Sequence, residues 1–179
     1  MKVLLHSCCG PCASACVPRL KDGGHAVTMF FSNSNIDTRE EYEKRLGAAR
    51  KLAEADGVEL VADAYDHADW LREVAAGCEH EPEKGRRCER CYRYNLARTA
   101  AYAAAQGFDA FTTSLTVSPH KPSAKIFAAS DDPRFVHADF KKKEGFRLSV
   151  RRAAELGLYR QSYCGCEFSR RNREKRHDS

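Results

Sequence analysis

The chain has 179 residues, of which 42% are hydrophobic, and its 30 Lys and Arg against 25 Asp and Glu give a formal net charge of +5. This length suits one ordinary domain with a sizeable core, and so mild a basicity is by itself only a slight sign of a nucleic-acid partner. His6 interrupts the first apolar run, and no stretch approaches the roughly 18 apolar residues of a membrane span, so we expect a cytoplasmic protein without a signal peptide.

The first half of the chain alternates short apolar runs with helical patterns, which is typical of parallel βαβ units. Strands are predicted at 2–6, 25–31, 58–63 and 108–114, with a further one at 134–139. Helices are predicted at 12–23, 38–56, 69–76, 88–107 and 146–159. Thr38 begins the second helix with a capping-box pattern, since Glu41 follows three residues later. The predicted fold class is therefore α/β, a single domain built on a parallel sheet.

Unusual loops follow three of these strands. Cys8 and Cys9 follow the first, a polar loop at 33–37 follows the second, and the segment 115–121 follows the fourth. In open parallel sheets the ligand site forms where loops leave the carboxyl ends of the strands. We expect right-handed crossovers to bring the three loops together, and the helix start at 88–91 to approach the same edge.

The nine cysteines fall into three groups, at 8–16, 78–91 and 164–166. In a reduced compartment, clustered cysteines are typical of metal binding or catalysis rather than of a disulfide framework. Cys16 is interpreted as a core residue and Cys78 as a bystander, which leaves seven candidate ligands: Cys8, Cys9, Cys12, Cys88, Cys91, Cys164 and Cys166. One tetrahedral zinc uses four ligands, so seven thiols favour two metal centres or a cluster with a second ion. The spacing alone does not choose among zinc, copper(I) and iron–sulfur.

Two of the cysteine pairs have a local geometry that can be predicted. Cys88 and Cys91 stand one turn apart at a helix start, where the helix N-terminus is expected to lower the thiol pKa. A dithiol redox pair or half a zinc site would look the same. Cys164 and Cys166 flank Gly165, which permits a close approach of the backbone.

Six motifs in order along the chain together resemble the epoxyqueuosine reductase family QueH. They are HSCCGPCA (6–13), FFSNSNIDTREEYEKR (30–45), RCERCYRYNLARTA (87–100), FTTSLTVSPHK (111–121), FKKKEGFRLS (140–149) and LYRQSYCGC (158–166). The resemblance predicts a family domain at 1–168 and leaves a basic C-terminal tail at 169–179. Ser34 and Ser114 stand where the family pattern leads us to expect proline and threonine, which are small exchanges.

The resemblance implies an adenine-nucleotide hydrolase-like (HUP, Rossmann-like) fold with a metal site at the carboxyl ends of the strands. It implies reductive removal of the epoxide oxygen of epoxyqueuosine at the tRNA wobble position, without cobalamin. The implied cofactors are a [4Fe-4S] cluster and a second metal ion, expected to be iron. Cys8, Cys9, Cys88 and Cys91 are the implied cluster ligands, and Cys12, Cys164 and Cys166 would serve the adjacent metal or the open face of the cluster. The partners would be tRNA carrying epoxyqueuosine in its anticodon loop and an unidentified electron donor, with no membrane.

Other side chains near these motifs are candidates for contact with substrate. The expected substrate-binding residues are Asn33, Asn35, Ser118, His120, Lys121 and Arg160, and the candidate proton donors are His120 and Asp139. Tyr92, Tyr94, Tyr159 and Tyr163 could stack on a splayed base or belong to the core. The cations that could meet phosphates, or simply be solvated, are Arg86, Arg87, Lys141, Lys142, Lys143 and Arg160.

Two other functions remain open at this point. The first is a zinc-stabilised RNA-binding module without redox activity. The second is a thiol–disulfide or tRNA-thiolation enzyme that uses Cys88 and Cys91 as its catalytic pair. Against thiolation, CCGPC (8–12) stands after the first strand where an ATP-dependent enzyme would need a glycine-rich phosphate-binding loop.

Overall fold

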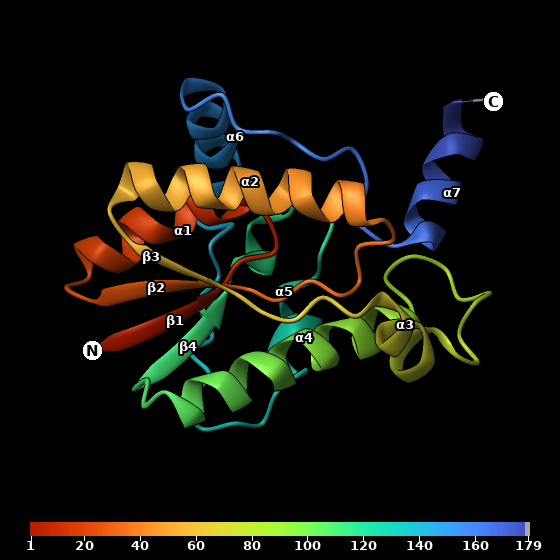
Figure 1. Cartoon of the computed structure of the whole chain (residues 1–179), viewed down its shortest axis with the longest axis horizontal. Coiled ribbons are helices and arrows are strands. Elements are labelled where there is room, and N and C mark those ends of the chain that lie inside the picture. Colours follow the sequence, from red (N-terminus) through yellow and green to blue (C-terminus); the bar gives the residue numbers. More distant parts are fainter. Residues whose placement is uncertain (178–179) are drawn as a thin grey trace.

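The computed structural model describes residues 1–177, with side chains to residue 174. Its centre is a four-stranded parallel sheet with the order β3-β2-β1-β4 (Figure 1). The strands are β1 (Lys2–His6), β2 (Ala26–Phe31), β3 (Glu59–Ala62) and β4 (Ala110–Thr113). The predicted α/β class with a parallel sheet is confirmed, and the topology fits a Rossmann-like fold. The last two residues of the expected tail, 178–179, lie outside the described residues.

Helices cover both faces of the sheet (Figure 1). Helices α1 (Gly10–Asp22) and α2 (Arg39–Asp56) lie on one face, α6 (Gly145–Glu155) packs against α1, and α4 (Arg86–Ala105) covers the other face. Successive strand residues therefore enter two different cores: Leu5 and Met29 belong to the core beneath α1 and α2, while Leu4 and Phe30 belong to the core beneath α4. Two buried faces explain why the strands read as continuous apolar runs.

The remaining helices are short or lie near the C-terminus. They are α3 (His67–Trp70), which continues into the π-helical turn η1 (Leu71–Ala75), the 3-10 turn η2 (Ser114–Val117), α5 (Ser123–Phe127) and α7 (Glu167–His177). Helix α7 runs across the predicted boundary between the domain and its basic tail. Within residues 1–177, no helix combines the length and the apolar character needed to cross a bilayer.

The predicted fifth strand at 134–139 is wrong. Phe135 makes one isolated bridge to Phe111, in which the Phe111 N–H donates to the Arg134 carbonyl (2.9 Å) and the Val136 N–H to the Phe111 carbonyl (2.8 Å). The neighbouring amides are used in turns instead, because Phe135 N donates to Asp132 O and Ala138 N to Val136 O (both 2.9 Å). An apolar pattern alone does not show that these amides have local acceptors.

The strand order creates a switch point between β1 and β4. From β1 the chain moves to β2 and β3 on one side of the sheet, and later returns to place β4 on the other side. Ligands of open α/β sheets bind in the crevice outside the carboxyl ends of the strands at such a point. Here the segments that leave β1 and β4 begin with Ser7-Cys8 and Ser114, so thiols and hydroxyls stand at the crevice.

Candidate metal centre and cavity

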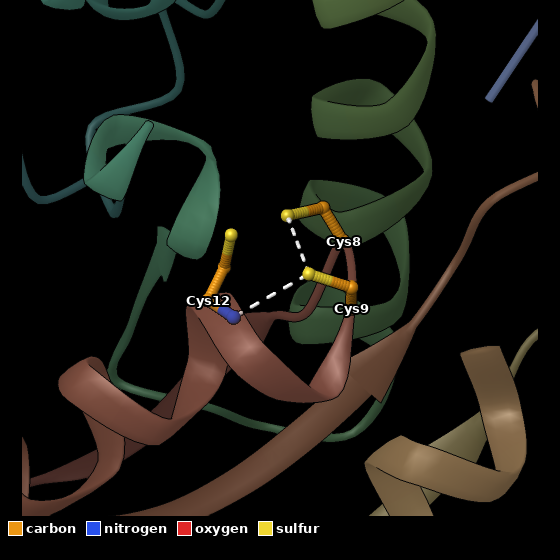
Figure 2. A group of neighbouring side chains, drawn as sticks. All are labelled: Cys8, Cys9 and Cys12. Atoms are coloured by element: carbon orange, nitrogen blue, oxygen red, sulfur yellow. Dashed lines mark hydrogen bonds between the residues drawn. The ribbon is translucent and has the colours of Figure 1, made fainter. Parts of the chain in front are cut away.

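Three thiols form a compact group, here called the thiol trio, at the start of α1. The Sγ atoms of Cys8, Cys9 and Cys12 all lie within 4.8 Å of one another (Figure 2). Cys9 is the N-cap of α1 in extended conformation, and its Sγ accepts the N–H of Cys12 at 3.4 Å. The CCGPC sequence therefore folds as a helix start whose N-cap is a sulfur.

The end of β4 fixes the first member of the thiol trio. Ser114 Oγ accepts the N–H of Cys8 at 3.0 Å and donates to Cys8 Sγ at 3.2 Å. Ser114 stands where a threonine was expected, and it keeps the hydroxyl group that makes both hydrogen bonds. The two strands that flank the switch point are thus joined at Cys8.

Within the trio, the negative charge is held at Cys9. Hydrogen bonds from the thiols of Cys12 and Cys8 lower the pKa of Cys9 well below its ordinary value. Hydrogen bonds to Cys8 and then to Cys9 raise the pKa of Cys12 well above its ordinary value. Of the three thiols, Cys9 is therefore the one that loses its proton most readily.

Cys88 and Cys91 lie in the first turns of α4, so the predicted CxxC at a helix start is confirmed. The Lys84 N–H donates to Cys88 Sγ at 3.3 Å, and Asn95 Nδ2 lies 3.8 Å from Cys91 Sγ. The expectation of a lowered pKa is wrong, because burial raises the pKa of Cys88 and raises that of Cys91 well above its ordinary value. Loss of hydration outweighs the helix N-terminus at both thiols.

Cys164 and Cys166 lie on a segment at 159–166, here called the C-terminal arm, which joins α6 to α7. Gly165 makes the close approach that was predicted. Its backbone has φ +147°, and a Cβ on this residue would lie 2.8 Å from Asn35 Nδ2. Its carbonyl accepts the N–H of Asp37 at 2.9 Å. The C-terminal arm is therefore pressed against the loop that follows β2, as Gly165 was expected to allow.

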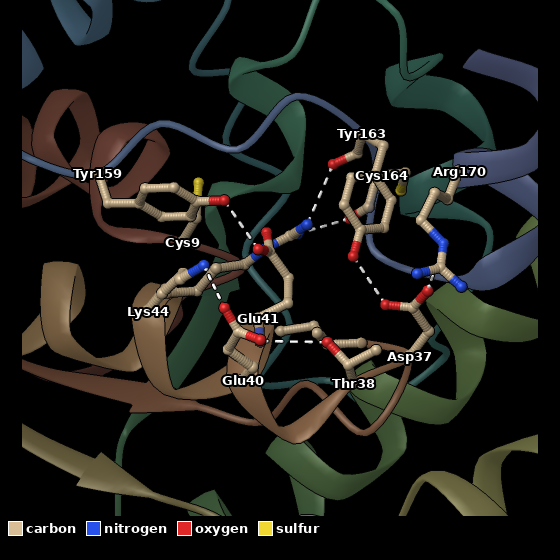
Figure 3. Close-up of polar contacts among 12 residues, drawn as sticks. Cys9, Asp37, Thr38, Glu40, Glu41, Lys44, Tyr159, Tyr163, Cys164 and Arg170 are labelled. Atoms are coloured by element: carbon tan, nitrogen blue, oxygen red, sulfur yellow. Dashed lines mark hydrogen bonds and ion pairs between the residues drawn. The ribbon is translucent and has the colours of Figure 1, made fainter. Parts of the chain in front are cut away.

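A buried arginine on α2 holds the C-terminal arm. Arg45, whose side chain is 1% exposed, pairs with Glu41 at 2.7 Å and donates to the carbonyls of Cys164 (2.8 Å) and Tyr163 (3.2 Å). Tyr159 donates to the second Glu41 oxygen at 2.7 Å (Figure 3). Glu41 was expected to complete a capping box, and only half of that box forms: its N–H donates to Thr38 Oγ1 (3.2 Å), while its carboxylate turns inward to Arg45.

Asp37 provides a second attachment for the same arm. Its carboxylate accepts from the Tyr163 hydroxyl at 2.7 Å and pairs with Arg170 of α7 at 3.1 Å (Figure 3). The loop after β2, the C-terminal arm and α7 are thereby joined around one buried carboxylate.

These elements enclose one cavity of about 490 Å³. Six cysteines from the three sequence groups line it: Cys8, Cys12, Cys88, Cys91, Cys164 and Cys166. Cys9, the seventh candidate ligand, lies behind the wall within the thiol trio. Cys16 is fully buried in the core on the inner side of α1, as predicted. Cys78 lies outside this cavity, and its Sγ accepts a hydrogen bond from Arg90 Nη1 at 3.4 Å.

The expected substrate-binding residues lie on the same wall. Asn33, Asn35, Ser118, His120, Lys121 and Arg160 all line the cavity. Asp139, a candidate proton donor, is not among the lining residues of the described chain, and its carboxylate accepts the N–H of Lys141 at 3.2 Å instead. The cavity wall also includes residues that the sequence did not single out as candidates for this site, among them Asn95, Phe146, Ser149 and Gln161.

Lys121 is a cation held among thiols. The nearby charge of Cys164 raises its pKa above the ordinary lysine value, with Cys8 adding to the effect. Lys141 Nζ supports this loop from behind, since it donates to the carbonyls of Lys121 (2.5 Å) and Ser118 (3.3 Å). Lys121 therefore presents a positive charge to the cavity.

Some cations expected at phosphates are used inside the protein. Arg87 is 2% exposed, donates to the carbonyls of Cys78 (2.9 Å) and Glu81 (2.7 Å), and lies over the ring of Phe168 at 4.3 Å, so its guanidinium is already engaged by the protein. Only its position in the helix could be read from the sequence. Its partners come from a loop and from α7.

The candidate tyrosines are also engaged within the protein. The hydroxyl of Tyr94 donates to Asp69 at 2.6 Å, and those of Tyr159 and Tyr163 are bound to carboxylates as described. Tyr92 belongs to α4 and is buried in the core on the inner side of that helix. Their rings are therefore fixed parts of the structure.

Comparison with known proteins gives one consistent result. The model of a family described as "Epoxyqueuosine reductase QueH" matches residues 3–172. Proteins named "Epoxyqueuosine reductase QueH" are similar along nearly the whole chain. The protein of Streptococcus pyogenes serotype M1 is 35% identical over 93% of this chain and 69% of its own length. The protein of Dehalococcoides mccartyi is 35% identical over 94% of this chain and 92% of its own length. The protein of Thermotoga maritima is 33% identical over 98% of this chain and 93% of its own length.

Proposed function

Because the chain belongs to the epoxyqueuosine reductase family QueH, we propose that it removes the epoxide oxygen of epoxyqueuosine at the wobble position of tRNA to give queuosine. The observation that carries this proposal is the convergence of six cysteines, from segments more than a hundred residues apart, on one cavity. Its volume of about 490 Å³ lies within the range of ligand pockets, roughly 300–1,000 Å³. A modified nucleoside splayed out of an anticodon loop would fit such a space.

The donor set fits an iron–sulfur protein. Replacing an epoxide by an alkene and water consumes two electrons and two protons, which ordinary side chains do not supply, so a redox cofactor is required. Thiolate-rich sites select iron–sulfur, zinc or copper(I), and a bound [4Fe-4S] centre supplies single electrons. The cluster would be held by Cys8, Cys9, Cys88 and Cys91. A second metal ion, expected to be iron, would be bound by Cys12, Cys164 and Cys166, or these three residues would face the open side of the cluster. Cys12 is grouped with Cys8 and Cys9 in space, so this division of the ligands stays a prediction.

The protein's own residues would bind the nucleoside and handle its protons. Asn33 Nδ2 donates to the Ser7 carbonyl (2.9 Å) and Asn35 Oδ1 accepts from Asn95 (3.3 Å), which orients both amides on the wall where the hydroxyls of the cyclopentane ring would lie. Lys121 would donate a hydrogen bond to the oxygen as its carbon–oxygen bond opens, and stabilise the negative charge there. His120, exposed on the same loop, would deliver to this oxygen a proton taken from solvent.

The reaction is tested by anaerobic incubation of the iron-loaded protein with epoxyqueuosine-containing tRNA and a chemical reductant, followed by mass spectrometry of the nucleosides. We expect loss of one oxygen atom from the modified nucleoside. Replacing Lys121 by Met should slow turnover by about 10²-fold or more, as removal of one donor to a developing oxyanion does elsewhere. Lys44→Met is the control, because Lys44 lies outside the cavity wall in an exposed pair with Glu40, and it should turn over like the wild type.

Metal analysis of the same samples separates the alternatives. A colourless protein that holds zinc, binds RNA and leaves the epoxide intact would be the zinc-stabilised RNA-binding module. Iron and acid-labile sulfide without any loss of oxygen would overturn the proposed reaction.

A further inference from the structure

An exposed aromatic ring stands at the mouth of the cavity. Phe146, in the first turn of α6, is 41% exposed and lines the cavity, whereas the other large exposed aromatic of the described chain, Tyr159, lies outside its wall with its hydroxyl bound to Glu41. A ring of this size normally contributes to a core by being buried. Its exposure at a site entrance therefore needs a different explanation.

The turn that presents Phe146 is held by an arginine from another helix. Arg19 of α1 donates to three backbone carbonyls of this turn, those of Phe140 (3.1 Å), Lys142 (2.8 Å) and Lys143 (2.7 Å). Phe140 itself is buried in the core beneath α1. The ring therefore projects from a fixed support.

The same turn contains strained backbone. Lys143 and Glu144 have φ of +54° and +57°, in the left-handed region that side chains disfavour. Gly145 follows, and a Cβ there would lie 1.6 Å from the Phe140 carbonyl oxygen, so no other residue fits. Backbone strain persists only where the surroundings hold it, and such positions gather at functional sites. Helix α6 begins directly after these strained residues, and this places its second residue, Phe146, at the cavity mouth.

Positive charge surrounds the ring. Lys142 and Lys143 are exposed just before it, and Arg160 and Arg173 line the same cavity. Acidic groups in this neighbourhood include Glu144, which pairs with Arg147 at 3.0 Å, Asp139, which accepts the N–H of Lys141 at 3.2 Å, and Glu83 on the cavity wall. An aromatic platform among cations is the arrangement by which proteins bind single-stranded nucleic acid, with bases on the ring and phosphates on the cations.

We propose that Phe146 is a stacking platform for a nucleobase of the RNA loop that delivers its modified nucleoside to the thiol-lined cavity, with Lys142, Lys143 and Arg160 at the flanking phosphates. The inference rests on the proposed function. The stacked base is a neighbour of the reacting nucleoside, because Phe146 lies exposed at the mouth while the reacting ring must reach the thiols inside.

The test uses the iron-loaded protein and a fluorescently labelled RNA hairpin with the sequence of an anticodon arm, with binding followed by anisotropy. Phe146→Leu keeps an apolar side chain but loses the ring, and we expect it to weaken binding about tenfold, the effect typical of one lost base–aromatic stack. Phe146→Trp keeps an aromatic face and should bind at least as tightly as the wild type. Val136→Ala removes another exposed apolar side chain, outside the cavity, and should change nothing.

A hairpin with an abasic site next to the wobble position identifies the stacked base. If the proposal holds, one such hairpin binds the wild type and Phe146→Leu equally, because the base that the ring contacts is already gone. Equal binding of the intact hairpin by the wild type, Phe146→Leu and Val136→Ala would overturn the inference. A second result would also overturn it. If Phe146→Leu binds RNA normally but turns over more slowly only when a protein supplies the electrons, the ring contacts a protein partner instead.

The same experiment distinguishes the two proposals. Failure of the reaction with intact, ring-dependent RNA binding would overturn the proposed function alone. Turnover by the wild type with ring-independent binding would overturn only the role of Phe146.

Discussion

Neighbouring cations on α2 show how burial decides the value of an ion pair. Lys44 and Arg45 each reach a glutamate four residues earlier, Glu40 at 2.6 Å and Glu41 at 2.7 Å. The first pair is 50% and 78% exposed, the second 1% and 9%. An exposed pair contributes about 0–1 kcal/mol, whereas breaking a buried pair costs about 3–5 kcal/mol, since it leaves a charge without a partner.

We therefore expect Arg45→Met to destabilise the protein by about 3–5 kcal/mol and Lys44→Met by no more than about 1 kcal/mol. Arg45→Met also frees the carbonyls of Tyr163 and Cys164, so the C-terminal arm should loosen and the protein should retain less iron. Denaturant unfolding and iron content, measured on both variants, check the prediction. Equal losses of stability and of iron in Arg45→Met and Lys44→Met would show that Arg45 does not hold the C-terminal arm.

The same residues show what could be predicted from the sequence. The motifs placed Glu41 at a helix start and Arg87 beside the CxxC, and both positions are confirmed. The direction of each side chain could not be predicted. Glu41 turns inward to Arg45, and Arg87 is buried by loop carbonyls and by Phe168, which comes from a helix far along the chain. Local patterns do not contain these distant partners.

At the scale of elements, one glycine, Gly10, fixes the contact between α1 and α2, and Gly47 offers a comparison. A Cβ on Gly10 would lie 2.7 Å from the carbonyl oxygen of Ala48 in α2, while a Cβ on Gly47 would meet nothing within 4 Å. Gly10 lies inside the CCGPC turn, so the close approach of the two helices also sets the position of the thiol trio.

Gly10→Ala should therefore destabilise the protein by about 1–3 kcal/mol, as overpacking does, and reduce its iron content. Gly47→Ala should stabilise it by about 0.5–1 kcal/mol, because alanine is the better helix former and has room. Thermal unfolding midpoints of the two variants give opposite shifts if the helix contact is as described. A stabilising effect of both substitutions would show that α1 can move away from α2 without cost.

Element prediction succeeded where one pattern dominates a segment. The apolar runs gave four strands close to their observed bounds, and Thr38 and the CxxC marked helix starts. The helix predicted at 69–76 is found as α3 followed by the π-helical turn over Leu71–Ala75. Three elements were missed: the 3-10 turn η2, α5, and α7, whose charged sequence was assigned to a basic tail. Helix α7 is attached through Phe168 and Arg170, which bind partners on α4 and after β2.

For the whole molecule, the topology explains the site better than any single motif. Cys8 follows β1, Ser114 follows β4, and the switch point between them could be expected from the alternation of strands and helices. The arrival of Cys164 and Cys166 at the same cavity does not follow from that alternation and was implied only by the family resemblance, because it depends on Arg45 and Asp37 holding the C-terminal arm. Metal ligands from so many segments should make those segments depend on the metal for their rigidity.

Removal of the metal should therefore loosen the segments at 8–16, 84–92 and 159–168 and leave the sheet unchanged. The strands are held by two cores of their own, in which Leu4, Leu5 and Met29 are fully buried. Hydrogen–deuterium exchange before and after anaerobic chelation measures this, and addition of chelator to protein already stripped of metal is the control. Faster exchange along every strand would mean that the metal holds the entire fold. Unchanged exchange at the thiol segments would mean that the protein alone already fixes them, in which case the cavity is preformed and its cysteines need no metal to stay together.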